Sequence, residues 1–329
     1  MPTKGESCPD SKFSAIILAA GIGKRMYAKT PKILHKILGK PIIQFVVDLA
    51  INANSSEIVL VVSRNHQPDI KKLFGHRIKY AIQEIPRGTG DAAKKGVALA
   101  KYDNVLILYG DVPLLTRMTL NKMIAYHRLN KAALTVLTCK MTDPSGYGRI
   151  IRGKGKQVTG IVEQTDADAE QEKINEINTG VYYGKREAFV NALARIKAKN
   201  KQTEYYLTDI IKELVRTRKK VVGYRITNEQ EIFGVNSRSD MAKVREIVRN
   251  AWFAELMNRG VYIEDPLTTI IDLTVKIGDF VQIKPFALIE GKTSITDNCV
   301  VGPFAWIKNN RVMNNKVGSG SWQIKKHNE

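Results

Sequence analysis

The stretch FSAIILAAGIGKRM (residues 13–26) joins a short apolar run to a loop that holds two glycines and two cations. The apolar run predicts a buried strand, and Gly21 and Gly23 allow the backbone to turn sharply and to point N–H groups at an anion. Lys24 and Arg25 add fixed positive charge. We interpret the loop as a phosphate-binding site at the end of the first strand of a sheet. A tight surface turn with solvated cations is the competing interpretation.

Two well-known phosphate motifs do not fit this loop. A dinucleotide-binding turn has the pattern G-x-G-x-x-G, but Met26 stands in place of its third glycine, and no acidic residue for the ribose is evident at the usual distance. A P-loop has the pattern G-x-x-x-x-G-K-[ST], but Leu18 stands in place of its first glycine and Arg25 in place of its hydroxyl residue. The sequence therefore favours a third kind of phosphate loop.

From residue 13 to about residue 236, apolar runs alternate with segments of helical periodicity. Strands are predicted at residues 14–20, 56–63, 104–111 and 132–139, and helices between them at residues 42–53 and 90–101. Buried strands that alternate with helices predict a mostly parallel sheet that is covered on both faces. Ligands of such sheets bind at the carboxyl ends of the strands. We therefore expect the glycine loop and Asp111, which ends another strand, to lie at one edge.

The composition limits the partners of the chain. Its 329 residues carry 52 Lys and Arg against 32 Asp and Glu, for a net charge of +20, which is typical of proteins that bind nucleic acid, an anionic surface or a polyphosphate. The cations are spread along the chain and are not interleaved with aromatic residues, so a nucleic acid is not favoured. There is no apolar run for a membrane span, no signal peptide and no paired cysteine spacing, so we expect a cytoplasmic protein.

A strict six-residue period begins at Ile271. The positions of the period are all aliphatic or Met: Ile271, Ile277, Ile283, Ile289, Ile295, Val301, Ile307 and Met313. A small or β-branched residue follows four residues after each of the first six, and the pattern breaks at Arg311. This period is the signature of a parallel β-helix. We expect about two and a half coils that end near Arg311, followed by a disordered tail.

Eight short motifs precede this repeat, and each of them alone is weak. In chain order they are TPKILH (30–35), QEIPRGTGDA (83–92), YGDVPL (109–114), GYGRI (146–150), VEQTDA (162–167), EINTG (176–180), EYYLTD (204–209) and GVN (234–236). Together, and followed by a hexapeptide β-helix, they closely resemble the uridylyltransferase half of the bacterial bifunctional N-acetylglucosamine-1-phosphate uridyltransferase/glucosamine-1-phosphate acetyltransferase family. The resemblance covers residues 13–313.

The resemblance implies a fold and a division of the chain. The fold is α/β: a Rossmann-like nucleotidyltransferase domain with a mostly parallel sheet, followed by a short left-handed parallel β-helix. The expected parts are a polar tail (1–12), the nucleotidyltransferase domain (13–236), a linker helix (237–262), a truncated hexapeptide β-helix (263–318) and a second polar tail (319–329).

The resemblance also implies an activity. UTP and N-acetylglucosamine 1-phosphate would react with the help of Mg²⁺ to give UDP-N-acetylglucosamine, a cell-wall precursor, and pyrophosphate. The protein would act mainly by positioning the reactants and neutralising their charge. Arg25, Lys32 and Asp111 are the expected catalytic residues, and Asp111 and Asn236 the expected Mg²⁺ ligands.

The expected substrate contacts follow from the same resemblance. Those to the nucleotide and phosphates are Leu18, Ala19, Ala20, Gly21, Lys32, Gln83, Gly88, Thr89, Tyr109, Gly110, Asp111 and Asn236. Those to the sugar are Gly148, Glu163, Asn178 and Thr208. Within the first group, Gln83, Gly88 and Thr89 would read uracil, because an amide side chain and a closely approaching backbone can match its donor and acceptor edge.

The sequence departs from the family in one respect. The bifunctional relatives continue through a longer β-helix that carries the acetyltransferase site, and no residue here matches that site; His327 lies beyond the hexads. We therefore expect no acetyl transfer, with a separate protein supplying the acetylated sugar, and a homo-oligomer (a trimer) through the β-helix. Two alternatives stay open: a nucleotidyltransferase for another sugar 1-phosphate or for dTTP, and a catalytically silent scaffold.

Overall fold

The computed structural model describes residues 12–21, 23, 26, 30–153, 157–313, 316–317 and 322–324, and only the backbone of the last five. Contacts divide the chain into two compact units that interleave along the sequence. Unit 1 takes Met1–Lys24, Pro31–Ile33 and Phe45–Gly234, and unit 2 takes Arg25–Thr30, Leu34–Gln44 and Val235–Glu329. The predicted domain boundaries at residues 13–236, 237–262 and 263–318 stay predictions.

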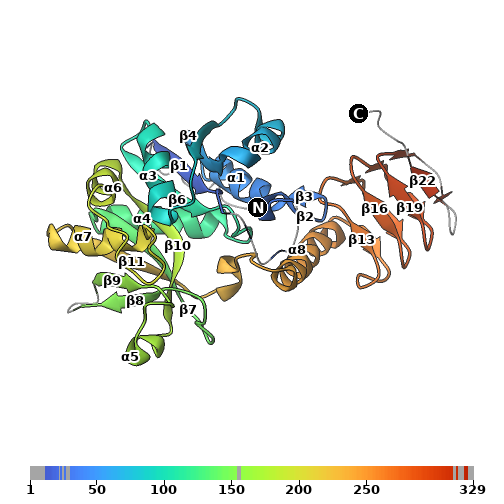
Figure 1. Cartoon of the computed structure of the whole chain (residues 1–329). Coiled ribbons are helices and arrows are strands. Elements are labelled where there is room, and N and C mark those ends of the chain that lie inside the picture. Colours follow the sequence, from blue (N-terminus) through green and yellow to red (C-terminus); the bar gives the residue numbers. More distant parts are fainter. Residues whose placement is uncertain are drawn as a thin grey trace. The chain divides into compact units, whose positions relative to one another are not determined.

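Unit 1 is built on one large sheet (Figure 1), in which seven strands follow the order β11-β7-β10-β6-β1-β4-β5. The strands are β1 (Phe13–Leu18), β4 (Glu57–Ser63), β5 (Lys79–Gln83), β6 (Asn104–Tyr109), β7 (Leu134–Lys140), β10 (Glu176–Lys185) and β11 (Val221–Ile226), with β8 (Arg149–Arg152) and β9 (Val158–Val162) joined to β10. β10 runs antiparallel to β6 and β7, and the other neighbours on this path are parallel. The prediction of a mostly parallel sheet is confirmed.

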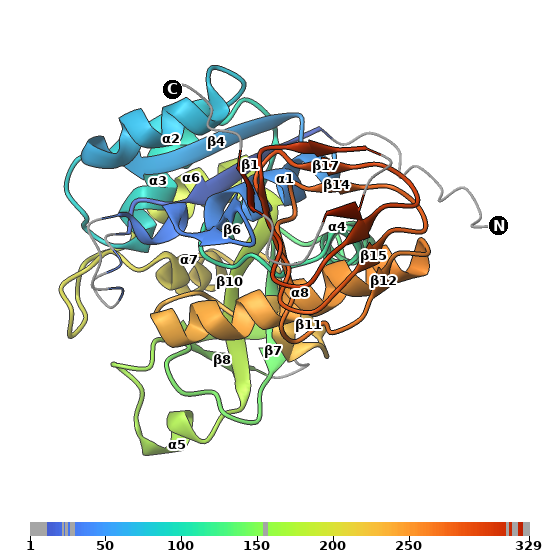
Figure 2. The ribbon, with the colours of Figure 1, turned by 90° about the vertical axis from the view of Figure 1, so that its right-hand side faces the viewer.

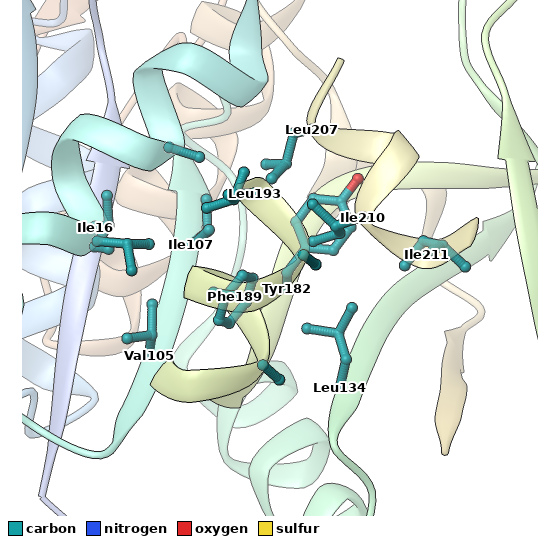
Figure 3. Close-up of a cluster of buried hydrophobic side chains, with 14 of the residues drawn as sticks. Ile16, Val105, Ile107, Leu134, Tyr182, Phe189, Leu193, Leu207, Ile210 and Ile211 are labelled. Atoms are coloured by element: carbon teal, nitrogen blue, oxygen red, sulfur yellow. The ribbon is translucent and has the colours of Figure 1, made fainter. Parts of the chain in front are cut away.

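Helices cover both faces of this sheet. They are α1 (Ile42–Asn52), α2 (Gln67–Phe74), α3 (Thr89–Leu99), α4 (Arg117–Leu129), α5 (Ala169–Glu172), α6 (Arg186–Leu193) and α7 (Ile210–Arg216). Figure 3 shows the core on one face, where Tyr182 of β10 packs with Phe189 of α6 and Ile210 of α7. Since neighbouring side chains of a strand point to opposite faces, Tyr183 lies on the other face, where its ring meets His127 of α4 at a centroid distance of 4.9 Å.

Gly96 explains how closely α3 approaches the sheet. A Cβ atom at this position would lie 2.4 Å from Cγ2 of Ile16 on β1 and 2.9 Å from Cγ2 of Val61 on β4. A side chain here would therefore push the helix away from the two central strands. The close packing fixes the start of α3 beside the carboxyl ends of β1 and β5.

Unit 2 combines a hairpin, a long helix and a β-helix. The hairpin pairs β2 (Lys36–Ile37) with β3 (Lys40–Pro41), and the backbone N–H of Leu273 donates to the carbonyl of Leu38 in its turn at 3.0 Å. The helix α8 (Arg238–Asn258) begins with a capping box, in which Ser237 Oγ accepts from the N–H of Asp240 and the Asp240 carboxylate accepts from the N–H of Ser237. None of the described helices is both long and apolar enough to cross a membrane.

The β-helix has three parallel sheets of short strands, which are seen clearly in Figure 2. Its strands are β12 (Tyr262–Ile263), β13 (Ile270–Ile271), β14 (Lys276–Ile277), β15 (Gln282–Ile283), β16 (Leu288–Glu290), β17 (Ser294–Ile295), β18 (Val300–Val301), β19 (Trp306–Lys308), β20 (Arg311–Val312), β21 (Lys316–Val317) and β22 (Trp322–Ile324). Lys276 pairs with Ser294, so one coil takes 18 residues (294 − 276). The hexad positions from Ile271 to Ile307 are buried, which confirms the predicted short left-handed parallel β-helix.

The predicted register fails in the last hexad. Ser294 pairs with Arg311, which shortens the coil to 17 residues (311 − 294), through a turn in which Asn309 has a φ of 51°. As a result Val312 is buried at 4% exposure, Met313 is 51% exposed, and Arg311 faces solvent. The prediction of Met313 as an inward residue is therefore wrong.

The predicted end of the β-helix near Arg311 is also wrong. β21 pairs with β18 and β22 pairs with β19, so the sheets continue to Ile324. The expected disorder of the tail 319–329 is contradicted at residues 322–324, and the rest of the tail, with His327, lies outside the described residues. The slip of one residue removes the reason for an early end, because the guanidinium of Arg311 never enters the apolar interior.

His127 should make the stability of the protein depend on pH. Burial, helped by the positive charges of Lys185 and Arg128, lowers the pKa of its ring from 6.5 to about 4. Because the unfolded chain binds the proton at higher pH, stability is fully present above pH 6.5 and is lost as the pH falls toward 4. We expect the free energy of unfolding to drop by about 2 kcal/mol from pH 7 to pH 5 through this group.

Urea unfolding at the two pH values, for the wild type and for His127→Gln, checks this expectation. The pH-dependent part of the loss should be smaller in the variant by about 2 kcal/mol. Equal pH dependence of the two proteins would contradict the assignment to His127.

Candidate active site

A cavity of about 500 Å³ lies in unit 1 at the carboxyl ends of β1, β5 and β6. Ten of the predicted site residues line it: Leu18, Ala19, Ala20, Gly21, Lys32, Gln83, Gly88, Thr89, Tyr109 and Asp111. Gly110 joins the same edge, since its N–H donates to the carbonyl of Leu18 at 2.9 Å. Parallel pairing of Leu18 with Tyr109 is what brings the glycine loop and Asp111 together.

A lysine and an aspartate form an ion pair in this cavity. Lys32 Nζ lies 2.5 Å from Asp111 Oδ2, and their side chains are 11% and 21% exposed. Lys32 begins a short 3-10 helix, η2 (Lys32–Leu34), and passes close to the glycine loop. Gly23 permits this approach, because it has a φ of +66° and a Cβ atom there would lie 2.6 Å from Cβ of Lys32. The pair places one cation and one anion beside the loop predicted to hold phosphates.

The other end of the cavity is formed by Gln83 and the start of α3. Gln83 ends β5 at 5% exposure, and its Nε2 donates to the carbonyl of Gly88 at 3.1 Å and to Asp91 Oδ2 at 2.9 Å. Gly88 has a φ of +106°, a conformation that other residues rarely adopt. Gln83 and Gly88, two of the three residues expected to read uracil, are therefore held against each other.

Residues 204–208 are tied to this start of α3. The N–H of Tyr205 donates to the carbonyl of Arg87 at 2.9 Å, and the N–H of Gly90 donates to the carbonyl of Tyr205 at 2.7 Å. The N–H of Leu207 donates to Thr89 Oγ1 at 3.0 Å. The predicted motif EYYLTD thus supports the base-reading loop from behind through three hydrogen bonds.

The four predicted sugar residues form a cluster beside the cavity. Thr208 Oγ1 donates to Glu163 Oε1 at 2.9 Å, and the N–H of Asn178 donates to the carbonyl of Gly148 at 2.8 Å. A Cβ atom at Gly148 would lie 3.2 Å from Glu163 Oε2, so the carboxylate rests against this glycine.

Tyr109 connects the cluster to the cavity. Its ring packs on Gly180, two residues after Asn178, where a Cβ atom would lie 2.6 Å from the ring. Burial, and after it the charge of Glu163, raises the pKa of the Tyr109 phenol, so the hydroxyl stays protonated. Burial likewise raises the pKa of Glu163, with the charges of Asp209 and Asp166 adding to the effect and the bond from Thr208 opposing it.

Comparison with known proteins now adds to this geometry. The model of the nucleotidyl transferase family matches residues 14–252, well over half of the chain. The chain belongs to the nucleotidyl transferase family. A second model, of the bacterial transferase hexapeptide with six repeats, matches residues 274–309.

Several curated proteins resemble this nucleotidyl transferase over most of its length. Those named bifunctional protein GlmU from Caldanaerobacter subterraneus subsp. tengcongensis and Thermoanaerobacter pseudethanolicus are 38% and 40% identical to it over 93% of the chain. The chain spans 66% and 65% of their lengths, just under two thirds. The resemblance predicted from the motifs is confirmed. A solved UDP-glucose pyrophosphorylase in complex with UDP-glucose has the same fold, with a TM-score of 0.61 at 20% identity, covering 74% of this chain and all of that one.

Nucleotidyl transferases of this type generally use a divalent metal, and Asp111 is suited to contact one. Among the described residues no group of three or more His, Cys, Asp or Glu could hold a metal ion alone. A single carboxylate at the edge of a polar cavity fits Mg²⁺, which keeps water and takes further oxygens from substrate phosphates. Asn236 belongs to unit 2, where its N–H donates to Asp240 Oδ2 at 3.0 Å, and its role as a second ligand stays a prediction. Arg25 lies outside the described residues.

Some residues of this nucleotidyl transferase site were not predicted individually. The cavity is also lined by Gly23, Ile33, Pro86, Ala92 and Glu204. Arg149 is buried at 2% exposure and donates from Nη2 to Gln164 Oε1 at 2.8 Å, which also accepts from the N–H of Gly146. It therefore fixes the loop that contains Gly148. The only sequence signal for Arg149 was its place in the motif GYGRI.

Gly88→Ala should damage the base end of the cavity. A Cβ atom would lie 2.6 Å from the carbonyl oxygen of Tyr205 and 2.9 Å from its nitrogen, and both are backbone atoms that cannot rotate away. We expect the KM for the nucleotide to rise about tenfold or more, because the loop must separate from residues 204–208. Gly75→Ala is the matched control, since Gly75 also has a positive φ but would meet nothing within 4 Å.

Steady-state kinetics of both variants, with thermal unfolding as the check on folding, test this prediction. A Gly88→Ala enzyme with the KM of the control variant would show that the close contact with Tyr205 does not shape the nucleotide site.

Proposed function

We propose that the chain is a Mg²⁺-dependent UDP-N-acetylglucosamine pyrophosphorylase, which joins UTP to N-acetylglucosamine 1-phosphate and releases pyrophosphate. One observation carries the proposal: the cavity that holds the Lys32–Asp111 pair also holds the buried amide of Gln83, and Tyr109 links it to a carboxylate–amide cluster. Such a site offers places for phosphates, a base and a sugar.

The chemistry asks the protein for position and charge. An oxygen of the sugar phosphate attacks the α-phosphorus of UTP, and pyrophosphate leaves on the opposite side. Lys32 and the N–H groups of residues 19–21 would neutralise and orient the triphosphate. Mg²⁺, when bound at Asp111, would supply further charge stabilisation of the phosphates.

The sugar cluster supports an N-acetylated substrate. Asn178 Oδ1 accepts from the N–H of Gly180 at 3.1 Å, which orients the side-chain amide so that its Nδ2 is the donor for a carbonyl such as that of an acetamido group. Glu163 is an acceptor for sugar hydroxyls, and Thr208 holds its carboxylate in place. Gly148 leaves room for the ring, since a side chain there would press on Glu163.

A substrate panel tests the proposal. Pyrophosphate release would be measured with Mg²⁺ for UTP, dTTP and CTP, each with the 1-phosphates of N-acetylglucosamine, glucose and glucosamine. We expect UTP with N-acetylglucosamine 1-phosphate to give the highest kcat/KM. Faster turnover of dTTP with glucose 1-phosphate would favour the other sugar-nucleotide assignment, and no turnover with any pair would favour a silent scaffold.

We further propose that the 329-residue polypeptide does not transfer acetyl groups. The described β-helix residues 261–313 contain no histidine, and their hexad positions are aliphatic. Thiol release from acetyl-CoA in the presence of glucosamine 1-phosphate should stay at the background rate. A saturable signal from the purified chain would contradict this proposal.

The assembly and location of the chain are proposals as well. A homo-oligomer, expected to be a trimer, would form through the β-helix, and light scattering during size-exclusion chromatography would measure its mass. We propose a cytoplasmic enzyme that acts on small substrates and has neither nucleic acid nor membrane as its partner.

A further inference from the structure

Asp91, which was not among the predicted site residues, controls the orientation of the Gln83 amide. It stands in the first turn of α3, and its Oδ2 accepts from Gln83 Nε2 at 2.9 Å. The same Nε2 donates to the carbonyl of Gly88 at 3.1 Å. Gln83 lines the cavity, whereas Asp91 does not.

The two partners leave the amide only one orientation. A carboxylate and a backbone carbonyl carry no hydrogen, so both can only accept, and the group that faces them must be the NH₂ of Gln83. Turning the amide by half a rotation would place its oxygen against two other oxygens and lose both hydrogen bonds. The carboxylate of Asp91 is itself favoured at the start of a helix, where the N–H groups of the first turn give a positive field.

This orientation has a consequence for the base. With both N–H bonds of Nε2 directed at Asp91 and Gly88, Oε1 is the atom of the amide that a ligand can meet, and it can only accept. Uracil presents an N–H donor at N3, while cytosine presents an acceptor at that position. A site that offers an acceptor pairs with the first base and leaves two acceptors facing each other with the second.

We propose that Asp91 is a specificity-determining positioning residue, which holds Gln83 so that the site selects a uracil-type base over cytosine. The inference rests on the proposed function, in which Gln83 reads the base of a nucleoside triphosphate. Asp91 acts without touching the nucleotide, through the orientation of one amide. It thereby makes the choice of base depend on a helix residue outside the cavity.

Three variants and one control separate this role from a structural one. Asp91→Leu removes the acceptor at similar volume, Asp91→Ala removes it without a bulky group, and Asp91→Asn keeps an acceptor oxygen but removes the charge. Asp69→Leu is the matched control, because Asp69 is the acidic residue in the first turn of another helix, α2. Thermal unfolding identifies the variants that are folded.

The readouts are kcat/KM for UTP and for CTP with one sugar phosphate, and the Kd values of UMP and CMP by calorimetry. The wild type should prefer the uracil nucleotides in both. Asp91→Leu and Asp91→Ala should lower the UTP-to-CTP ratio about tenfold or more, mainly through the KM for UTP. Asp91→Asn should stay within about threefold of the wild type, and Asp69→Leu should leave the ratio unchanged.

The outcomes are distinguishable. A wild type without preference for uracil nucleotides would overturn both the proposed function and the inference. A wild type with that preference, together with a folded Asp91→Leu or Asp91→Ala enzyme that keeps the same ratio, would overturn the inference alone. Equal loss of the ratio in Asp91→Asn and Asp91→Leu would overturn the argument from the acceptor.

Discussion

Asp111→Ala is expected to lower the rate of pyrophosphate release about a thousandfold while the protein stays folded. Asp111 follows β6 at the edge of the cavity, where its carboxylate contacts Lys32 Nζ at 2.5 Å. In the proposed reaction it is the residue of unit 1 that holds Mg²⁺, so its loss removes charge stabilisation of several kcal/mol from the phosphates.

The measurement is kcat at saturating substrates over a range of Mg²⁺ concentrations, with thermal unfolding alongside. Asp103→Ala is the matched control, because Asp103 is an exposed aspartate just before the other end of the same strand. The control should keep its rate within about twofold of the wild type. A folded Asp111→Ala enzyme with near-normal, Mg²⁺-dependent turnover would exclude Asp111 as an essential ligand.

Lys32→Met is expected to lower kcat/KM about a hundredfold or more, close to the effect of removing one oxyanion donor. Lys32 is 11% exposed and lies against the glycine loop, so it is positioned to neutralise charge on the triphosphate as the α-phosphorus is attacked. Methionine keeps most of the packing volume and removes the charge. Lys71→Met, which changes an exposed lysine of α2, serves as the control.

A double-mutant cycle shows whether Lys32 acts on the substrate or only balances Asp111. If its sole task is to compensate the buried carboxylate, Asp111→Asn should make the loss of Lys32 harmless, and the double variant should be no slower than Asp111→Asn alone. If it acts on the phosphates, the double variant should be slower than either single variant. Equal rates for Asp111→Asn and the double variant would therefore contradict the catalytic role of Lys32.

The central sheet and most of the β-helix could be predicted because each follows a regular period. The apolar runs that end at Leu18 and Tyr109 mark buried parallel strands, and the hexads from Ile271 to Ile307 mark inward positions. The motifs also placed ten site residues that the structure brings to one cavity. These features depend on residues close together in the sequence, or on a period that repeats without error.

The features that sequence reasoning missed depend on single long-range contacts. The bond from Gln83 to Asp91 and the bond from Arg149 to Gln164 have no period and no residue type that singles them out. The slip before Val312 has a similar cause, since one residue fewer in a tight turn moves the next residue inward. A rule of six cannot foresee a coil of seventeen.

The hydrogen bond from Leu273 to Leu38 bears on how the chain folds while it is being made. The hairpin of β2 and β3 leaves the ribosome early, but this partner follows 235 residues later (273 − 38). At about 5–20 residues per second, synthesis of that span takes about 10 to 50 s. During this time the hairpin lacks the backbone donor of Leu273, and because distant contacts slow folding, unit 2 should complete its structure late. Conditions that pause translation within residues 45–234 should therefore prolong an incompletely folded state and its exposure to proteases.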